Sequence, residues 1–115
     1  METQLLSTDT EEGFNEALEL AVAQLRQGEV VAVPTETVYG LAANALEASS
    51  VEKIFTAKDR PAQNPIIVHV SSESMARDCV AQWPESAGKL ANAFWPGPLT
   101  LVLPKADNIP GNVTA

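Results

Sequence analysis

The sequence has one cysteine, one histidine and no long hydrophobic run among its 115 residues. A single cysteine excludes an internal disulfide and fits a reducing compartment, so we expect the protein in the cytoplasm. One histidine and one cysteine cannot supply the usual zinc ligand sets, so no metal site is expected. No stretch approaches the roughly 20 apolar residues that a membrane span requires, and the N-terminus lacks the basic and apolar segments of a signal peptide.

The sequence also lacks a glycine-rich phosphate loop of the Walker or Rossmann type, so any bound ATP must be held by other residues. A protein nucleophile is equally absent from the pattern. Cys79 falls four residues after Met75 on the apolar side of an expected helix, which favours packing over catalysis.

Basic residues are few, because seven lysines and arginines face fifteen acidic residues and the net charge is -8. The acidity is concentrated in residues 1–36, which hold eight acidic residues and one base, and a solvated helix face accounts for it. Lys53, Lys58 and Arg60 form the one local basic cluster. This distribution permits a small phosphate pocket but shows no broad nucleic-acid surface.

Apolar residues at helical and strand spacing predict alternating helices and strands. The first helix carries a stripe from Phe14 to Leu25, with Thr8 and Glu11 as a capping box and Gly28 as its stop. A second helix is expected from Ser49 or Ser50 to about Lys58, with Ser49 and Glu52 at capping-box spacing. Two more are expected, one capped by Ser71 and Ser72 and running through Val80, and one that begins at Pro84 with Leu90, Ala93 and Phe94 inward. The expected strands are Val30 to Val33, Pro65 to Val70, and Leu99 to Leu103.

This order of elements predicts an α+β (α/β-like) fold of three layers around a twisted mixed sheet. Three buried strands make a thin sheet for so many helices. We therefore expect residues 1–115 to be the N-terminal part of a single larger domain.

Polar side chains open directly from the first strand. Thr35, Glu36, Thr37 and Tyr39 place three hydroxyls and a carboxylate within five positions, which suits recognition of a substrate alcohol or carboxylate. The alternative is an ordinary turn, since Pro34 ends the strand and threonines favour local backbone hydrogen bonds.

Two cations follow the second helix. Lys58 and Arg60 stand beside Pro61 and Asn64, so guanidinium, ammonium and amide groups could hold one phosphate chain. Alternatively, the cations only interact with the C-terminal end of the helix dipole, which is worth about 0.3–1 kcal/mol. His69 shares a strand face with Ile67, where a half-buried histidine without a ligand role is the simpler interpretation.

Three segments together resemble the YrdC-like family of threonylcarbamoyl-AMP synthases. They are Val33-Pro34-Thr35-Glu36-Thr37-Val38-Tyr39-Gly40-Leu41, then Lys58-Asp59-Arg60-Pro61 with Asn64-Pro65-Ile66, then Trp95-Pro96-Gly97-Pro98-Leu99-Thr100. The resemblance implies a YrdC-like fold and a nucleotidyltransferase that condenses L-threonine, bicarbonate and ATP to threonylcarbamoyl-AMP and pyrophosphate. It places the protein in the threonylcarbamoyladenosine modification of tRNA, with Mg²⁺ expected on the phosphates.

The same resemblance implies roles for individual residues. Thr37 and His69 would bind threonine, Arg60 and Asn64 would bind ATP, and Lys58 and Arg60 would serve as catalytic cations on the phosphates. Implied partners are tRNA or double-stranded RNA and the tRNA-modification proteins that accept the adenylate. A later Ser-x-Asn signature and an arginine-bearing strand, both typical of the family, do not occur within the 115 residues.

Two alternatives of another kind stay open. One is a non-catalytic module that binds nucleotides or double-stranded RNA, against which the acidic balance weighs. The other is the related carbamoyl-transfer domain of hydrogenase maturation proteins, whose accessory acylphosphatase or zinc-finger domains this sequence does not show.

Overall fold

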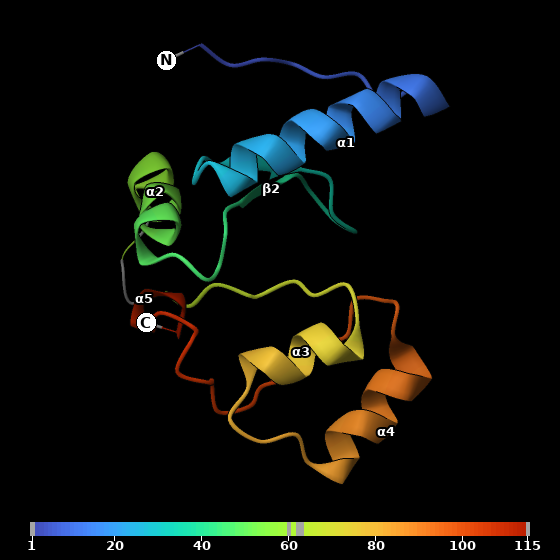
Figure 1. Cartoon of the computed structure of the whole chain (residues 1–115), viewed down its shortest axis with the longest axis vertical. Helices are drawn as coiled ribbons and strands as arrows, with labels where there is room; N and C mark the ends of the chain where they lie inside the picture. Colours follow the sequence, from blue (N-terminus) through green and yellow to red (C-terminus); the bar gives the residue numbers. More distant parts are fainter. Residues whose placement is uncertain (1, 60, 62–63, 115) are drawn as a thin grey trace.

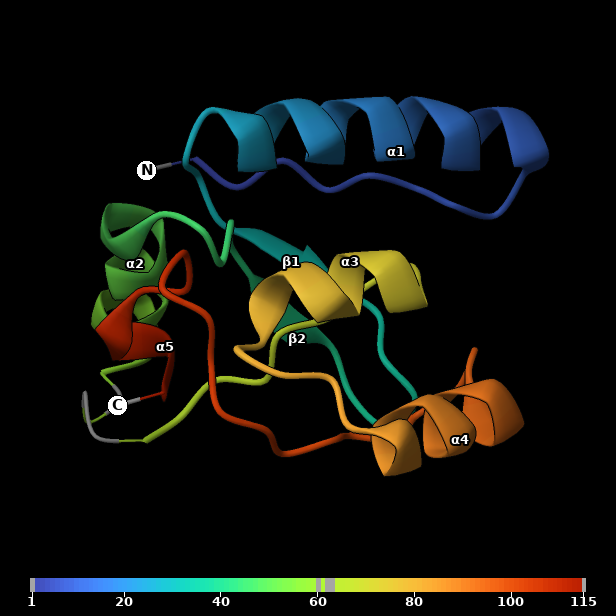
Figure 2. The same ribbon diagram turned by 60° about the horizontal axis from the view of Figure 1, so that its bottom comes forward.

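The computed structural model describes residues 2–59, 61 and 64–114. Its elements, in chain order, are α1 (Glu11–Arg26), β1 (Val31–Val33), β2 (Gly40–Ala42), α2 (Ala48–Lys58), α3 (Glu73–Cys79), α4 (Glu85–Phe94) and α5 (Gly111–Thr114). Helix α1 lies over the β1–β2 hairpin, α2 and α5 lie side by side at one end, and α3 and α4 lie on the side away from α1 (Figures 1 and 2). The combination of helices and a small sheet confirms the predicted α+β class.

Side chains cap the starts of α1 and α3, whereas α2 and α4 have no side-chain cap hydrogen bond. Ser72 begins α3 as expected, since its hydroxyl accepts a hydrogen bond from the Met75 amide at 3.1 Å. For α1 the cap is Thr10, which accepts from the Gly13 amide at 3.0 Å, so the prediction of Thr8 was wrong by two residues. Ser49 lies inside α2 and does not cap it.

The sheet differs from the expected mixed sheet. In the described residues, β1 and β2 pair antiparallel, with Val31 opposite Ala42 and Val33 opposite Gly40. The predicted strands 65–70 and 99–103 are not strands in this structure, although their residues alternate between exposed and partly buried. Hydrogen bonds explain the difference, because an alternating sequence becomes a strand only when its backbone N–H and C=O groups bond to a neighbouring strand. The Ile66 amide bonds the Val113 carbonyl at 2.8 Å instead of a flanking strand.

The hydrophobic core joins α2 to α5. Val51 and Phe55 of α2 pack with Ile109 and Val113, and all four are at most 4% exposed. The Asn112 amide nitrogen adds a hydrogen bond of 2.9 Å to the Ala48 carbonyl. Ile66 and Val68 rest against the same cluster, so the extended segment 65–70 is positioned from one side by this core.

Helix α2 also anchors the end of α1. The Lys53 ammonium donates to the Gly28 carbonyl at 2.9 Å and to the Glu29 carboxylate at 3.1 Å. Gly28 has a left-handed φ of 82°, and an added Cβ would come within 3.1 Å of the Ser50 hydroxyl. A glycine at this turn therefore allows α1 to end directly against α2.

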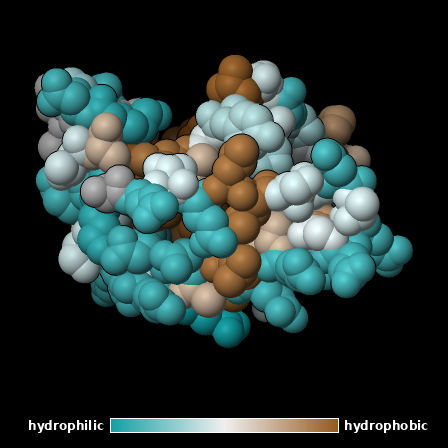
Figure 3. All heavy atoms as spheres, turned by 90° about the horizontal axis from the view of Figure 1, so that it is seen from above, coloured by the Kyte–Doolittle hydropathy of each residue, from teal (hydrophilic) through white to brown (hydrophobic). Residues whose placement is uncertain are grey.

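Much apolar surface stays uncovered. The accessible surface is 8544 Å², whereas a compact protein of 12.2 kDa exposes about 6,100 Å². The radius of gyration is 15.2 Å, against about 13 Å for a compact domain of this length. A hydrophobic band crosses the face on the α1 side (Figure 3), and the large exposed apolar residues in this part of the chain are Leu5, Phe14, Leu18 and Leu20. No helix in the described ranges is long and apolar enough to cross a membrane.

Candidate functional site

The predicted hydroxyl cluster forms the tip of the β1–β2 hairpin. Because Val33 pairs with Gly40, residues 34–39 form one loop, and every residue in it is exposed. The Thr37 side chain is therefore open to solvent, and the Tyr39 side chain is 75% exposed. Within the loop, Thr35 bonds through its hydroxyl to the backbone of Val38. The cluster is thus both a turn and an accessible set of hydroxyls, so the two interpretations of this segment coexist.

His69 lies in the extended segment 65–70 and points to the exposed face, as Ile67 does. Its Nδ1 is 3.2 Å from the Ile67 carbonyl oxygen. A carbonyl oxygen can only accept, so this contact is a hydrogen bond in the tautomer that carries the proton on Nδ1. The histidine is exposed instead of half-buried.

The predicted phosphate clamp is described only in part. Lys58 is the last residue of α2, and its side chain is exposed. Asp59 then takes a left-handed φ of 50° and ends the helix. Asn64 is exposed, and its backbone N–H donates to the Pro61 carbonyl at 3.0 Å. Arg60, the second cation of the predicted clamp, lies outside the described residues.

The arrangement in space is elongated. In Figures 1 and 2, the hairpin loop and α2 lie toward opposite sides of the molecule. Arg60 lies outside the described residues, so the expectation that the two cations meet an anion held over the end of the first strand stays a prediction. Segment 65–70 runs from beside α5 and α2 toward the other side (Figure 2).

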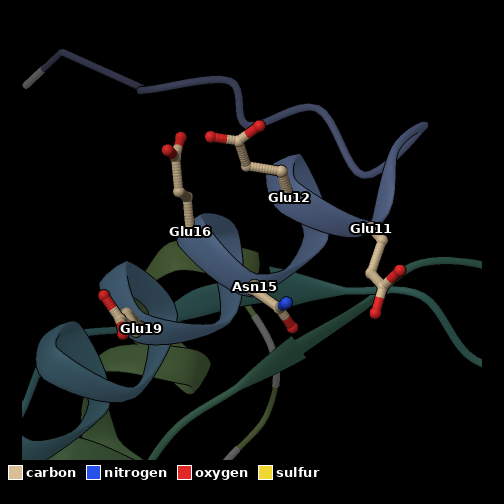
Figure 4. A pocket seen from close by; sticks show the side chains of 5 residues that line it. All are labelled: Glu11, Glu12, Asn15, Glu16 and Glu19. Atoms are coloured by element: carbon tan, nitrogen blue, oxygen red, sulfur yellow. The ribbon is translucent and has the colours of Figure 1, made fainter.

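Two surface hollows lie away from these residues. One of about 350 Å³ is lined by Glu11, Glu12, Asn15, Glu16 and Glu19 on α1, and Figure 4 shows four separate carboxylates around it. The other, of about 600 Å³, lies along α3 and α4 and includes Arg77 and Trp83. Within the ranges described, no group of three or more histidine, cysteine or acidic side chains is placed to hold a metal. Neither hollow contains a predicted site residue.

Cys79 behaves as a packing residue, as the sequence indicates. Burial, assisted by the charge of neighbouring Asp78, raises the pKa of its thiol above the ordinary 9.0. Its Sγ donates to the Met75 carbonyl at 3.3 Å, and the side chain contacts the core cluster. A thiol kept neutral in this way is a poor nucleophile.

Comparison with known proteins agrees with the motifs. The family model Sua5/YciO/YrdC, described as "Telomere recombination", matches residues 23–115. The chain is 50% identical over 97 residues to a threonylcarbamoyl-AMP synthase of Pyrococcus abyssi, covering 84% of this chain and 28% of that protein. It is 53% identical over 96 residues to the synthase of Bacillus subtilis, covering 83% of this chain and 28% of the relative.

Solved structures show the same similarity. The structure of Pyrococcus abyssi Sua5 complexed with L-threonine matches with a TM-score of 0.81 at 50% identity, over 84% of this chain and 28% of that one. The chain thus spans less than a third of the length of these relatives.

Proposed function

Because the chain belongs to the Sua5/YciO/YrdC family, we propose that it supplies part of a threonylcarbamoyl-AMP synthase. This enzyme would condense L-threonine, bicarbonate and ATP into threonylcarbamoyl-AMP and pyrophosphate, for the modification of tRNA. The observation that carries the proposal is the 50% identity, over 97 residues, to a synthase of this activity. A further support is that the similar Pyrococcus abyssi structure holds L-threonine.

The proposed reaction needs no protein nucleophile, which fits a chain whose one cysteine is partly buried and neutral. The threonine amine attacks the carbon of bicarbonate and, with loss of water, gives a carbamate. A carbamate oxygen then attacks the α-phosphorus of ATP, and the bond to the bridging oxygen breaks to release pyrophosphate. Catalysis would consist of positioning the reactants and stabilising phosphate charge.

We assign the two ends of the elongated site to the two ends of the product. Thr37 would donate or accept a hydrogen bond at the threonine moiety, and the exposed imidazole of His69 would form a hydrogen bond with its N–H or hydroxyl. Lys58, Arg60 and Asn64 would hold the phosphates of ATP, with Lys58 and Arg60 as the catalytic cations. The separation of α2 from the hairpin loop fits a substrate that joins an amino acid to a nucleotide.

Mg²⁺ would accompany ATP as part of the substrate. The described residues offer no cluster of metal ligands, so we assign no side chain to the ion. Magnesium commonly binds through substrate phosphates and water, which is consistent with this assignment.

We also propose that residues 1–115 form one part of a larger single domain. The excess of exposed apolar surface supports this, because a further layer of polypeptide would cover it. The match to the Pyrococcus abyssi relative covers 84% of this chain but only 28% of that protein, which agrees with this proposal. We keep the cytoplasm as the expected compartment, on the single cysteine alone.

The test is a hybrid in which residues 23–115 replace the matching segment of the Pyrococcus abyssi relative, with pyrophosphate release measured with and without threonine and bicarbonate. We expect Lys58→Ala and Arg60→Ala each to lower the rate by about 10²-fold or more, the scale for losing a transition-state charge donor. Matched controls are Lys89→Ala and Arg26→Ala, which remove exposed cations from α4 and α1.

Release that depends on all three substrates, and that falls only in the first pair of variants, supports the proposal. Equal rates in both pairs would refute the phosphate assignment. RNA binding without pyrophosphate release would favour the alternative of a non-catalytic module for double-stranded RNA or tRNA. In that case the affinity should fall steeply with salt.

A further inference from the structure

The hairpin loop that carries Thr37 has no core contact to hold its shape. All six residues from Pro34 to Tyr39 are exposed, and the flanking pair of Val33 and Gly40 fixes only its two ends. A hydroxyl that binds a substrate must nevertheless be held in place, because the affinity falls in proportion to the fraction of molecules in the binding-competent conformation. Some contact within the loop must therefore define it.

Thr35 makes that contact through both functions of its hydroxyl. The Oγ1 donates a hydrogen bond to the Val38 carbonyl, and it accepts one from the Val38 amide N–H at 3.3 Å. The N–H and the C=O of Val38 are both bonded to this one hydroxyl, which closes a turn from residue 35 to residue 38. Thr37 lies inside this closed turn, next to the residue that is bonded.

The methyl group of Thr35 contributes a second restraint. A Cβ built on Gly40 would lie 3.4 Å from Thr35 Cγ2, so the methyl group lies against the backbone at the start of β2. Thr35 thus spans the loop from its entry to its exit. Serine would keep the hydrogen bonds and lose the methyl contact, whereas valine would keep the shape and lose the hydrogen bonds.

We propose that Thr35 is a positioning residue that holds the Thr37 hydroxyl where the substrate amino acid binds. This inference rests on the proposed function, which assigns Thr37 to L-threonine. The O–H of Thr35 and one of its two lone pairs are used by Val38, so we assign this side chain to the loop and not to a substrate contact. Its removal should therefore weaken threonine binding and leave the chemical step nearly unchanged.

The first measurement uses the 115-residue chain as it is. Amide hydrogen exchange at Val38, followed by NMR, should accelerate about fivefold in Thr35→Val, the factor that corresponds to one net hydrogen bond. In Thr35→Ser it should stay within twofold of wild type. Equal exchange in wild type and Thr35→Val would show that the hydroxyl does not order the loop and would overturn the inference.

The second measurement uses pyrophosphate release by the hybrid enzyme. Thr35→Val should raise KM for L-threonine about fivefold with kcat within twofold, and Thr35→Ser should restore KM. Thr37→Val should raise KM by about tenfold or more. A normal KM in Thr35→Val beside a raised KM in Thr37→Val would overturn the positioning role and leave the proposed function standing. A normal KM in Thr37→Val would instead refute the threonine assignment itself.

Discussion

The core between α2 and α5 should dominate the stability of this chain, and a pair of phenylalanines tests it. Phe55 is 4% exposed in the cluster with Val51 and Val113, whereas Phe14 on α1 is 50% exposed. Removing a buried phenylalanine loses about 1.5–3 kcal/mol of transfer free energy, and the cavity raises the total cost to about 3–5 kcal/mol. For Phe14→Ala, with half of the side chain already in water, we expect about 1 kcal/mol or less.

These losses are large compared with the total free energy of unfolding. Folded domains are stable by about 5–15 kcal/mol, and a chain that exposes this much apolar surface belongs near the lower end. Urea unfolding followed by circular dichroism should therefore show Phe55→Ala displaced by about 2 M or already partly unfolded, with Phe14→Ala close to wild type. Equal shifts in the two variants would refute the assignment of the core. In the hybrid enzyme, a KM for L-threonine that rises in Phe55→Ala would further show that this core positions segment 65–70.

Two other predictions concern the anchor of α1 and the thiol. Lys53→Met removes the hydrogen bond to the Gly28 carbonyl and should lower the free energy of unfolding by about 1 kcal/mol, measured by urea titration at low salt; an unchanged midpoint would contradict it. Because the pKa of Cys79 is raised, its contribution to stability is complete below the ordinary value of 9.0 and is lost as the pH rises through the folded value. Disulfide-exchange reagents should accordingly react more slowly with folded than with urea-unfolded protein near pH 9, and equal rates there would count against a buried neutral thiol.

The helices could be predicted from the sequence because each signal is local. The apolar stripe from Phe14 to Leu25 and the cap at Ser72 are confirmed by α1 and α3. The exact cap of α1 could not be chosen, since Thr8 and Thr10 both stand at suitable spacing and differ little in energy. The buried face of α4 was also wrong, because Ala87 and Ala91 are buried while Phe94 is 59% exposed.

Elements that depend on distant partners could not be predicted. Strand β2 contains a glycine and only three residues, and its pairing with β1 defines it. Helix α5 has four residues, including Gly111 and Asn112 with poor helix propensity, and its contact with α2 holds it in place. The reverse holds for 65–70, whose strand pattern meets no partner strand in the described part of the chain.

The candidate site follows the same division. The motifs selected Thr37, His69, Lys58 and Asn64 as candidate ligand residues, and the structure shows all four exposed, including His69, for which the strand pattern predicted half-burial. How far the hairpin lies from α2 depends on how these elements pack, which no motif encodes. The hydrogen bond of Thr35 to Val38 is of a common kind, in which a threonine bonds to the backbone three residues later. Because such bonds occur in many turns, the sequence alone could not assign this one a role.

The hydrogen bond between Asn112 and Ala48 joins distant parts of the chain, which matters during synthesis on the ribosome. The two residues are 64 positions apart in the chain. At about 5–20 residues per second, roughly 3–13 s pass between translation of the first and of the second. During that delay Phe55 and Val51 lack their core partners Ile109 and Val113, so a nascent chain would expose the apolar face of α2 to chaperones until α5 has been translated.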